Sequence, residues 1–135
     1  MLRIIRDILA SLARTGVAMT EITTIDQLDA CLKTSGEKPV FIFKHSTRCP
    51  ISSGANARIA KFLLSKEDEN EDLPEFYLLK VVESRAVSNA LADQLHVPHQ
   101  SPQLLLIEKG ECAWYTSHHN INADNIEKAI QNATA

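Results

Sequence analysis

The chain has 135 residues, of which 44% are hydrophobic and 23% are charged, and its formal net charge is −3. This length and composition predict one globular domain that can bury a proper core without disulfides or a structural metal. The slight negative charge, without a basic stripe or interleaved aromatic residues, gives no reason to expect a nucleic-acid-binding protein.

Three cysteines, Cys31, Cys49 and Cys112, are spread along the chain. An odd and sparse set is a poor disulfide framework and suits a reducing cytoplasm. Their spacing also lacks the paired ligands that are typical of zinc sites. We therefore expect a cytoplasmic protein with no metal site and no bound cofactor.

Residues 1–18 are interpreted as an N-terminal extension, and residues 19–135 as the domain. The extension places five apolar residues at helical spacing: Leu2, Ile5, Ile8, Leu9 and Leu12. It is too short for a transmembrane span, is interrupted by charges, and lacks the continuous apolar core of a secretory signal. An added surface helix or a misplaced translation start is therefore expected, and no membrane partner. A membrane-surface helix or a transit peptide is the alternative.

Downstream of the extension, the pattern of apolar residues alternates between helical and strand periods. It indicates, in order, a short strand at 20–23, a helix at 24–36 capped by Thr24, a strand at 39–43, a helix starting at Pro50, an acidic loop at 65–75, a strand at 75–83, a helix at 84–97 capped by Ser84, hairpin strands at 102–108 and 112–117, and a helix at 122–133. A strand–helix–strand unit requires a parallel pair, whereas a hairpin adds antiparallel strands. The predicted fold is therefore α/β, with a mixed central sheet covered by helices on both faces.

Cys49 lies in the stretch KHSTRCPIS, residues 44–52, between the strand at 39–43 and the next helix. Pro50 suits the first helical position, where its missing N–H costs nothing. The sulfur then faces unpaired backbone N–H groups and the positive end of the helix dipole, and both favour thiolate over thiol.

Polar neighbours of Cys49 strengthen this interpretation. Lys44, His45 and Arg48 are expected to add positive charge that stabilises the thiolate. Ser52 follows one helical turn after Cys49, and its hydroxyl can donate a hydrogen bond to the sulfur. Ser52 cannot attack a mixed disulfide as a second cysteine would, so the stretch predicts one-thiol exchange. An incidental cysteine at a helix start is the alternative.

The other two cysteines are interpreted as packing residues, because unpaired cysteine is often buried. Cys31 lies on or beside the apolar face of the helix at 24–36. Cys112 precedes Trp114 on a hairpin strand, where we expect both side chains on the same face, and packing is favoured over a resolving role.

Four stretches together, KHSTRCPIS, SRAVSN, HQSPQLLLI and YTSHHNI, resemble the bacillithiol-linked, monothiol bacilliredoxin family of thioredoxin-fold proteins. The resemblance covers roughly residues 20–132 in the order of the elements, although Arg48 stands where the family usually has a threonine. It implies a thioredoxin-like three-layer α/β/α sandwich, with Cys49 as the nucleophile and Pro102 as a cis-proline. The loop at Ser101 and Pro102 would then pair with an extended substrate, and His99 would lie near the thiol as a substrate contact or proton shuttle.

The activity implied by this resemblance is thiol-disulfide exchange. The Cys49 thiolate would attack the bacillithiol sulfur of a protein mixed disulfide, and another thiol would then open the Cys49 disulfide. S-thiolated proteins are the expected partners, with bacillithiol or a similar low-molecular-weight thiol as co-substrate. The alternatives are a thioredoxin-fold binding protein whose Cys49 no longer turns over and a monothiol glutaredoxin-like iron–sulfur carrier.

Overall fold

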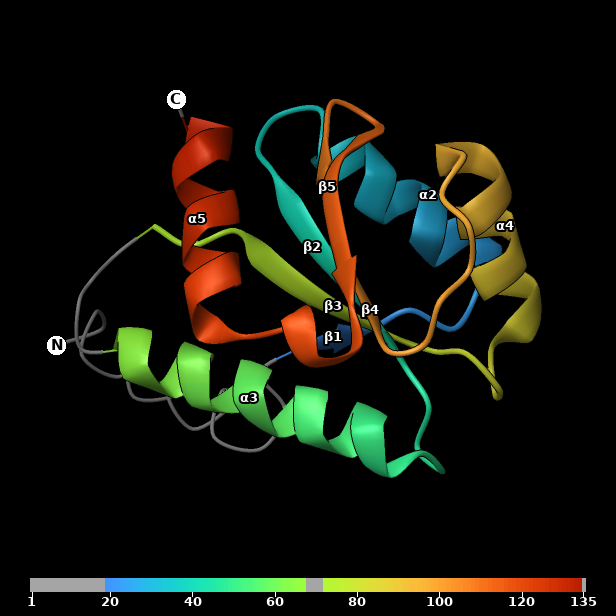
Figure 1. Cartoon of the computed structure of the whole chain (residues 1–135). Coiled ribbons are helices and arrows are strands. Elements are labelled where there is room, and N and C mark those ends of the chain that lie inside the picture. Colours follow the sequence, from blue (N-terminus) through green and yellow to red (C-terminus); the bar gives the residue numbers. More distant parts are fainter. Residues whose placement is uncertain (1–18, 68–71, 135) are drawn as a thin grey trace, which may run out of the picture.

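A computed structural model of the chain describes residues 19–67 and 72–134, so the predicted extension, residues 1–18, and part of the acidic loop lie outside the described residues. The elements follow in the order β1 (Thr20–Glu21), α2 (Ile25–Thr34), β2 (Val40–His45), α3 (Pro50–Lys66), β3 (Glu75–Lys80), α4 (Arg85–Leu95), β4 (Gln103–Glu108), β5 (Glu111–Ser117), the 3₁₀ turn η2 (His118–Asn120) and α5 (Ala123–Thr134) (Figure 1).

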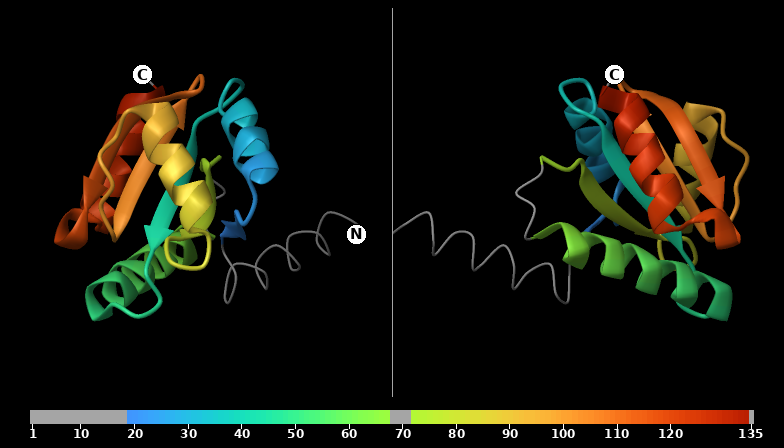
Figure 2. Two further views of the ribbon diagram at one scale, coloured as in Figure 1. Left: turned by 90° about the vertical axis from the view of Figure 1, so that its right-hand side faces the viewer. Right: turned by 60° about the vertical axis from the view of Figure 1, so that its left-hand side comes forward.

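The strands form one mixed sheet in the order β1-β3-β2-β4-β5. β3 is parallel to both β1 and β2, whereas β4 is antiparallel to β2 and to β5. Helices α2 and α4 pack on one face of the sheet, and α3 and α5 pack on the other (Figure 2). The predicted three-layer α/β/α sandwich is therefore confirmed.

Strand residues alternate between the two cores, as the two-residue period of a strand requires. On the α3/α5 side, the ring of Phe41 stacks on Phe76 with centroids 4.5 Å apart and meets Trp114 edge-on at 6.3 Å. Val40 and Ile42 enter the other core, beneath α2 and α4. Both faces of β2 are buried, which explains its unbroken apolar run.

Helix starts and the hairpin turn follow from local sequence. Thr24 accepts a hydrogen bond from the Gln27 N–H, and the Gln27 side chain accepts one from the Thr24 N–H, which completes a capping box. Lys109 and Gly110 adopt left-handed φ values of 53° and 75° in the turn between β4 and β5. Two such residues in succession are typical of the tight hairpin turn whose twist matches that of the strands.

β2 is longer than the sequence pattern indicates, because it continues through Lys44 and His45. These two residues pair with Leu79 and Lys80 of β3, and both are buried. The apolar run ends at Phe43, so the residue pattern alone placed both polar side chains in a loop. Pairing with β3, and for Lys44 also with Gln103 of β4, overrides that local signal.

The expectation that Cys112 and Trp114 share a face is wrong. An irregularity in the β4–β5 ladder sets Leu106 opposite Trp114 but the next residue, Ile107, opposite Cys112. The extra residue on β5 is a β-bulge, which breaks the alternation of side chains. Cys112 consequently packs on the α2/α4 side and Trp114 on the α3/α5 side.

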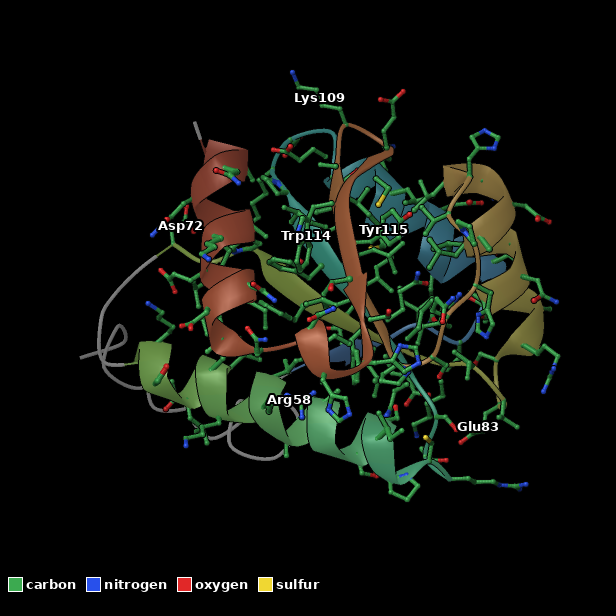
Figure 3. All side chains as sticks on the ribbon, in the orientation of Figure 1. Arg58, Asp72, Glu83, Lys109, Trp114 and Tyr115 are labelled. Carbon is green, nitrogen blue, oxygen red and sulfur yellow. The ribbon has the colours of Figure 1, made fainter. Side chains whose placement is uncertain are left out.

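Arg58 joins the middle of α3 to the segment between β5 and α5 (Figure 3). Its Nε donates to the carbonyl of Ile121 at 2.6 Å and its Nη2 to the carbonyl of His118 at 3.1 Å. We expect Arg58→Met to lower the free energy of unfolding by about 2–3 kcal/mol, since two carbonyl groups lose a charged donor. Urea denaturation would measure the change, with Lys61→Met on the exposed face of α3 as the control. An equal change in both variants would contradict the expectation.

Candidate active site

Cys49 is the N-cap residue of α3, with an extended backbone at φ −108° and ψ 122°, and Pro50 occupies the first helical position. Its carbonyl accepts from the Ser53 N–H at 3.0 Å, and its own N–H donates to the carbonyl of Ser46 at 3.2 Å. The side chain is partly exposed and makes no capping hydrogen bond. The backbone therefore holds Cys49 at the positive end of the helix and leaves the sulfur available for reaction.

Three chain segments meet at the edge of the sheet where Cys49 lies. β2 and β3 are parallel, so both end there, whereas β4 is antiparallel to β2 and begins there. This topology brings the loop 46–48, the turn after β3 and the segment before Gln103 together. The Thr47 hydroxyl donates to the Glu83 carboxylate at 3.3 Å, and Figure 3 shows Glu83 close to the amino end of α3.

The bond between Ser101 and Pro102 is cis, the isomer that the resemblance implied. The Pro102 carbonyl accepts from the His118 N–H at 3.1 Å, and the Gln103 side-chain amide donates to the carbonyl of Pro98 at 3.1 Å. The Ser101 hydroxyl is buried and has no hydrogen-bond partner among the residues that the structure describes. The segment before β4 is thus held at both ends beside the Cys49 loop.

His99 lies on the exposed part of this segment, three residues before Pro102. Partial desolvation lowers its pKa below the ordinary value for histidine, and the nearby charges of Lys44 and Arg85 lower it further. At neutral pH His99 is therefore mainly uncharged, which suits hydrogen bonding better than binding of an anion.

Ser52 has other partners than the one expected from the sequence. Its side chain is fully buried, with 0% of its surface exposed. Its Oγ accepts from the Ser46 N–H at 2.9 Å and lies 2.6 Å from Nδ1 of His45. The hydroxyl that we expected to stabilise the Cys49 thiolate is instead bonded to the end of β2.

The three cations expected near Cys49 have different environments. Burial lowers the pKa of His45 and the charge of Lys80 lowers it further, while Glu83 acts in the opposite direction, so the expectation that His45 adds positive charge at neutral pH is wrong. Lys44 enters the core under α2 and α4, on the face opposite α3, and burial lowers its pKa to about 8. Arg48, next to Cys49, is exposed.

The residue pattern missed several contributors to this surface. Glu83 holds the Cys49 loop through Thr47, and two apolar side chains remain exposed on flanking segments, Ile51 at 43% and Val82 at 39%. The signal that could have found Glu83 and Val82 is the parallel pairing of β2 and β3, which sends both strand ends to one edge.

Cys31 and Cys112 lie away from this surface, in the core under α2 and α4. Burial raises the pKa of Cys31 to about 12, helped by the charge of Glu75, and burial also raises the pKa of Cys112. Both are therefore protonated thiols that serve packing at neutral pH.

Residues 19–67 and 72–134 contain neither a metal-binding cluster nor a membrane-spanning helix. Within these ranges, His, Cys, Asp and Glu form no group of three or more that could hold a metal ion. No helix within them combines the length and the apolar character needed to cross a membrane.

Comparisons with known proteins agree with this geometry. The family model described as monothiol bacilliredoxin BrxC matches residues 20–126. A solved structure described as a candidate oxidoreductase with a thioredoxin fold is 30% identical, with a TM-score of 0.73 over 85% of this chain and 96% of that one. Mitochondrial thioredoxin 3 of Saccharomyces cerevisiae is 18% identical, with a TM-score of 0.64 over 87% and 98% of the two chains. Spinach chloroplast thioredoxin f is 16% identical, with a TM-score of 0.65 over 92% and 94%. These two share the fold, and the family match over most of the chain places the protein in the monothiol bacilliredoxin family of thioredoxin-fold thiol oxidoreductases.

Proposed function

We propose that this protein removes bacillithiol, or a similar low-molecular-weight thiol, from protein mixed disulfides through Cys49. The observation that carries the proposal is a partly exposed sulfur at the amino end of α3, beside a cis-proline segment and without a second thiol one turn later. The family match to monothiol bacilliredoxins supports bacillithiol as the small thiol.

The proposed exchange proceeds in two balanced steps. The Cys49 thiolate attacks the bacillithiol sulfur, so the Cys49–bacillithiol disulfide forms and the protein thiolate leaves and takes a proton from water. A second small thiolate then attacks that same bacillithiol sulfur. This step releases the Cys49 thiolate and a symmetrical disulfide of the small thiol.

Selection of substrates would rest on the surface around Cys49. The exposed guanidinium of Arg48 is suited to the carboxylates of a small thiol. The backbone at Ser101 and Pro102 would pair with an extended segment of an S-thiolated protein, by addition of a strand. Three unpaired cysteines fit a reducing compartment, so we place this activity in the cytoplasm.

The test is to incubate a bacillithiolated model protein with the full chain and to follow intact masses. We expect the bacillithiol group to move to Cys49, and Cys49→Ala to accept none of it. Cys112→Ala, which removes a half-buried packing thiol, should behave like the wild type and is the matched control. The proposal is wrong if no group moves to a wild-type protein whose Cys49 still reacts with iodoacetamide. A coloured protein on anaerobic purification would favour the iron–sulfur alternative instead.

A further inference from the structure

The hydroxyl of Ser52 is fully committed to hydrogen bonds inside the protein. A serine hydroxyl has one proton to donate, and its oxygen can accept from other donors. Oγ of Ser52 accepts from the Ser46 N–H. The hydroxyl proton of Ser52 is therefore available to Nδ1 of His45, which lies 2.6 Å from Oγ. Within residues 19–67 and 72–134, the Ser52 hydroxyl makes no further hydrogen bond. His45 is then neutral and carries its own proton on Nε2.

These hydrogen bonds join the end of β2 to the first turn of α3, on either side of the loop 46–48 that precedes Cys49. His45 is fixed at the end of β2 by its pairing with Lys80 and by its ring, which stacks on Phe43 with centroids 5.3 Å apart. Ser52 fixes the first turn of α3 to the same point, and the Cys49 N–H bonds back to the Ser46 carbonyl. The position of the Cys49 backbone therefore depends on the bond between helix and strand.

We infer that Ser52 and His45 form a positioning pair that holds the loop 46–48, and with it the sulfur of Cys49, in the geometry for attack on a disulfide. This inference deepens the proposed exchange and rests on it. The pair acts on the placement of the sulfur and makes no bond to it. Ser52 is thus a structural hydroxyl one helical turn after Cys49.

The charge state of His45 decides which partner donates in the Ser52–His45 hydrogen bond. The groups that act on His45 are the charges of Lys80, from β3, and Glu83, from the turn after it, and the hydroxyl of Ser52 in the first turn of α3. Burial and Lys80 lower the pKa of His45, so Nδ1 is a free acceptor at neutral pH. In acid, His45 gains a proton on Nδ1, the bond reverses so that Nδ1–H donates to Oγ, and the buried hydroxyl proton of Ser52 loses its acceptor.

The experiment measures the alkylation of Cys49 in the full chain by iodoacetamide, resolved by peptide mass spectrometry between about pH 5 and pH 8. Each rate is divided by the thiolate fraction, read from ultraviolet absorbance. Cys31 and Cys112 do not contribute to that absorbance because burial raises both pKa values. We expect Ser52→Ala and His45→Phe to lower the rate per thiolate about tenfold, the scale of a slightly misplaced reacting atom.

His45→Asn is the matched control, because its side-chain oxygen can take the place of Nδ1 as the acceptor but does not titrate. We expect it to keep the neutral-pH rate per thiolate. We also expect the wild-type rate per thiolate to fall in acid and the rate of His45→Asn not to fall. The inference is wrong if Ser52→Ala and His45→Phe react at the same rate per thiolate as the wild type. It is also wrong if these substitutions change only the fraction of Cys49 that is thiolate. If Ser52→Ala does not fold, the contrast between His45→Phe and His45→Asn decides. Alkylation needs no bacillithiol, so this test is independent of the exchange assay. If the wild type fails to take bacillithiol from a model protein, the proposed function is wrong, but the alkylation rates still test the positioning pair.

Discussion

Replacing Ser52 by cysteine is expected to shorten the life of the Cys49 mixed disulfide by about 100-fold. Residue 52 lies one helical turn after the N-cap residue, and Cα atoms at this spacing are roughly 5–6 Å apart, which is within the range that a disulfide can bridge. The new thiolate would attack the Cys49 sulfur, release the small thiol and leave a disulfide between Cys49 and the introduced cysteine. An intramolecular attack of this kind replaces a collision with a second thiol, which explains the large effect.

The measurement is the time course of the Cys49–bacillithiol adduct, quenched by alkylation and read by mass spectrometry. Ser52→Ala is the matched control, because it loses the same hydroxyl without gaining a thiol. An adduct that persists equally long in the two variants would contradict the prediction. The free energy of unfolding should also be about 1–3 kcal/mol lower in both variants than in the wild type. In Ser52→Ala the part-buried N–H of Ser46 loses its acceptor, and in Ser52→Cys it has only a sulfur, which is a weak acceptor.

The fold was predictable because each element carries its own local signal. The apolar faces of the helices, the buried run before Cys49 and the cap at Thr24 define the elements, and strand–helix–strand order defines the parallel pairs. The bulge in β5 was not predictable, because the residues ECAWYTS alternate in a way that also fits a regular strand. Only the pairing with β4 shows which residue is extra.

The candidate site was predictable as a set of residues but less so as a set of interactions. The motif around Cys49 and the serine–proline step at 101–102 identify the segments that meet at the sheet edge. The bond between Ser52 and His45 depends on two facts that a motif does not contain. β2 extends as far as His45, and α3 packs on the face that His45 shares. The same extension of β2 buries Lys44 on the opposite face, where the residue pattern had placed a surface cation.

Lys44→Met is expected to raise the free energy of unfolding by about 2–3 kcal/mol at neutral pH. Lys44 is 1% exposed, and it forms no ion pair with a carboxylate of residues 19–67 or 72–134. Burial lowers its pKa from 10.5 to about 8, so a charged ammonium in the fold is costly at neutral pH. Methionine has a similar length and brings no charge into this core.

The stability difference between Lys44→Met and the wild type should depend on pH, which a change in packing alone would not cause. Between about pH 8 and pH 10.5 the unfolded chain binds more protons at residue 44 than the folded chain does, so the wild type gains stability as the pH rises. The advantage of Lys44→Met should therefore be complete below about pH 8 and shrink above it. Urea denaturation across this window measures the effect. Lys80→Met, which removes a 31%-exposed ammonium 3.5 Å from Glu21, should change the stability by less than about 1 kcal/mol.

A lower free energy of unfolding in Lys44→Met would instead mean that a hydrogen bond stabilises the buried ammonium. The structure indicates Gln103 as its partner. Gln103 lies directly opposite Lys44 in the β2–β4 ladder, on the same face, and its side-chain oxygen has no hydrogen-bond partner among the described residues. A small shift of the lysine would let Nζ donate to that oxygen. Gln103→Leu separates the two cases. If Lys44 and Gln103 are hydrogen-bonded, Gln103→Leu should lower the free energy of unfolding as much as Lys44→Met does. The double variant should then lower it little further, because removing both partners leaves no unpaired polar group.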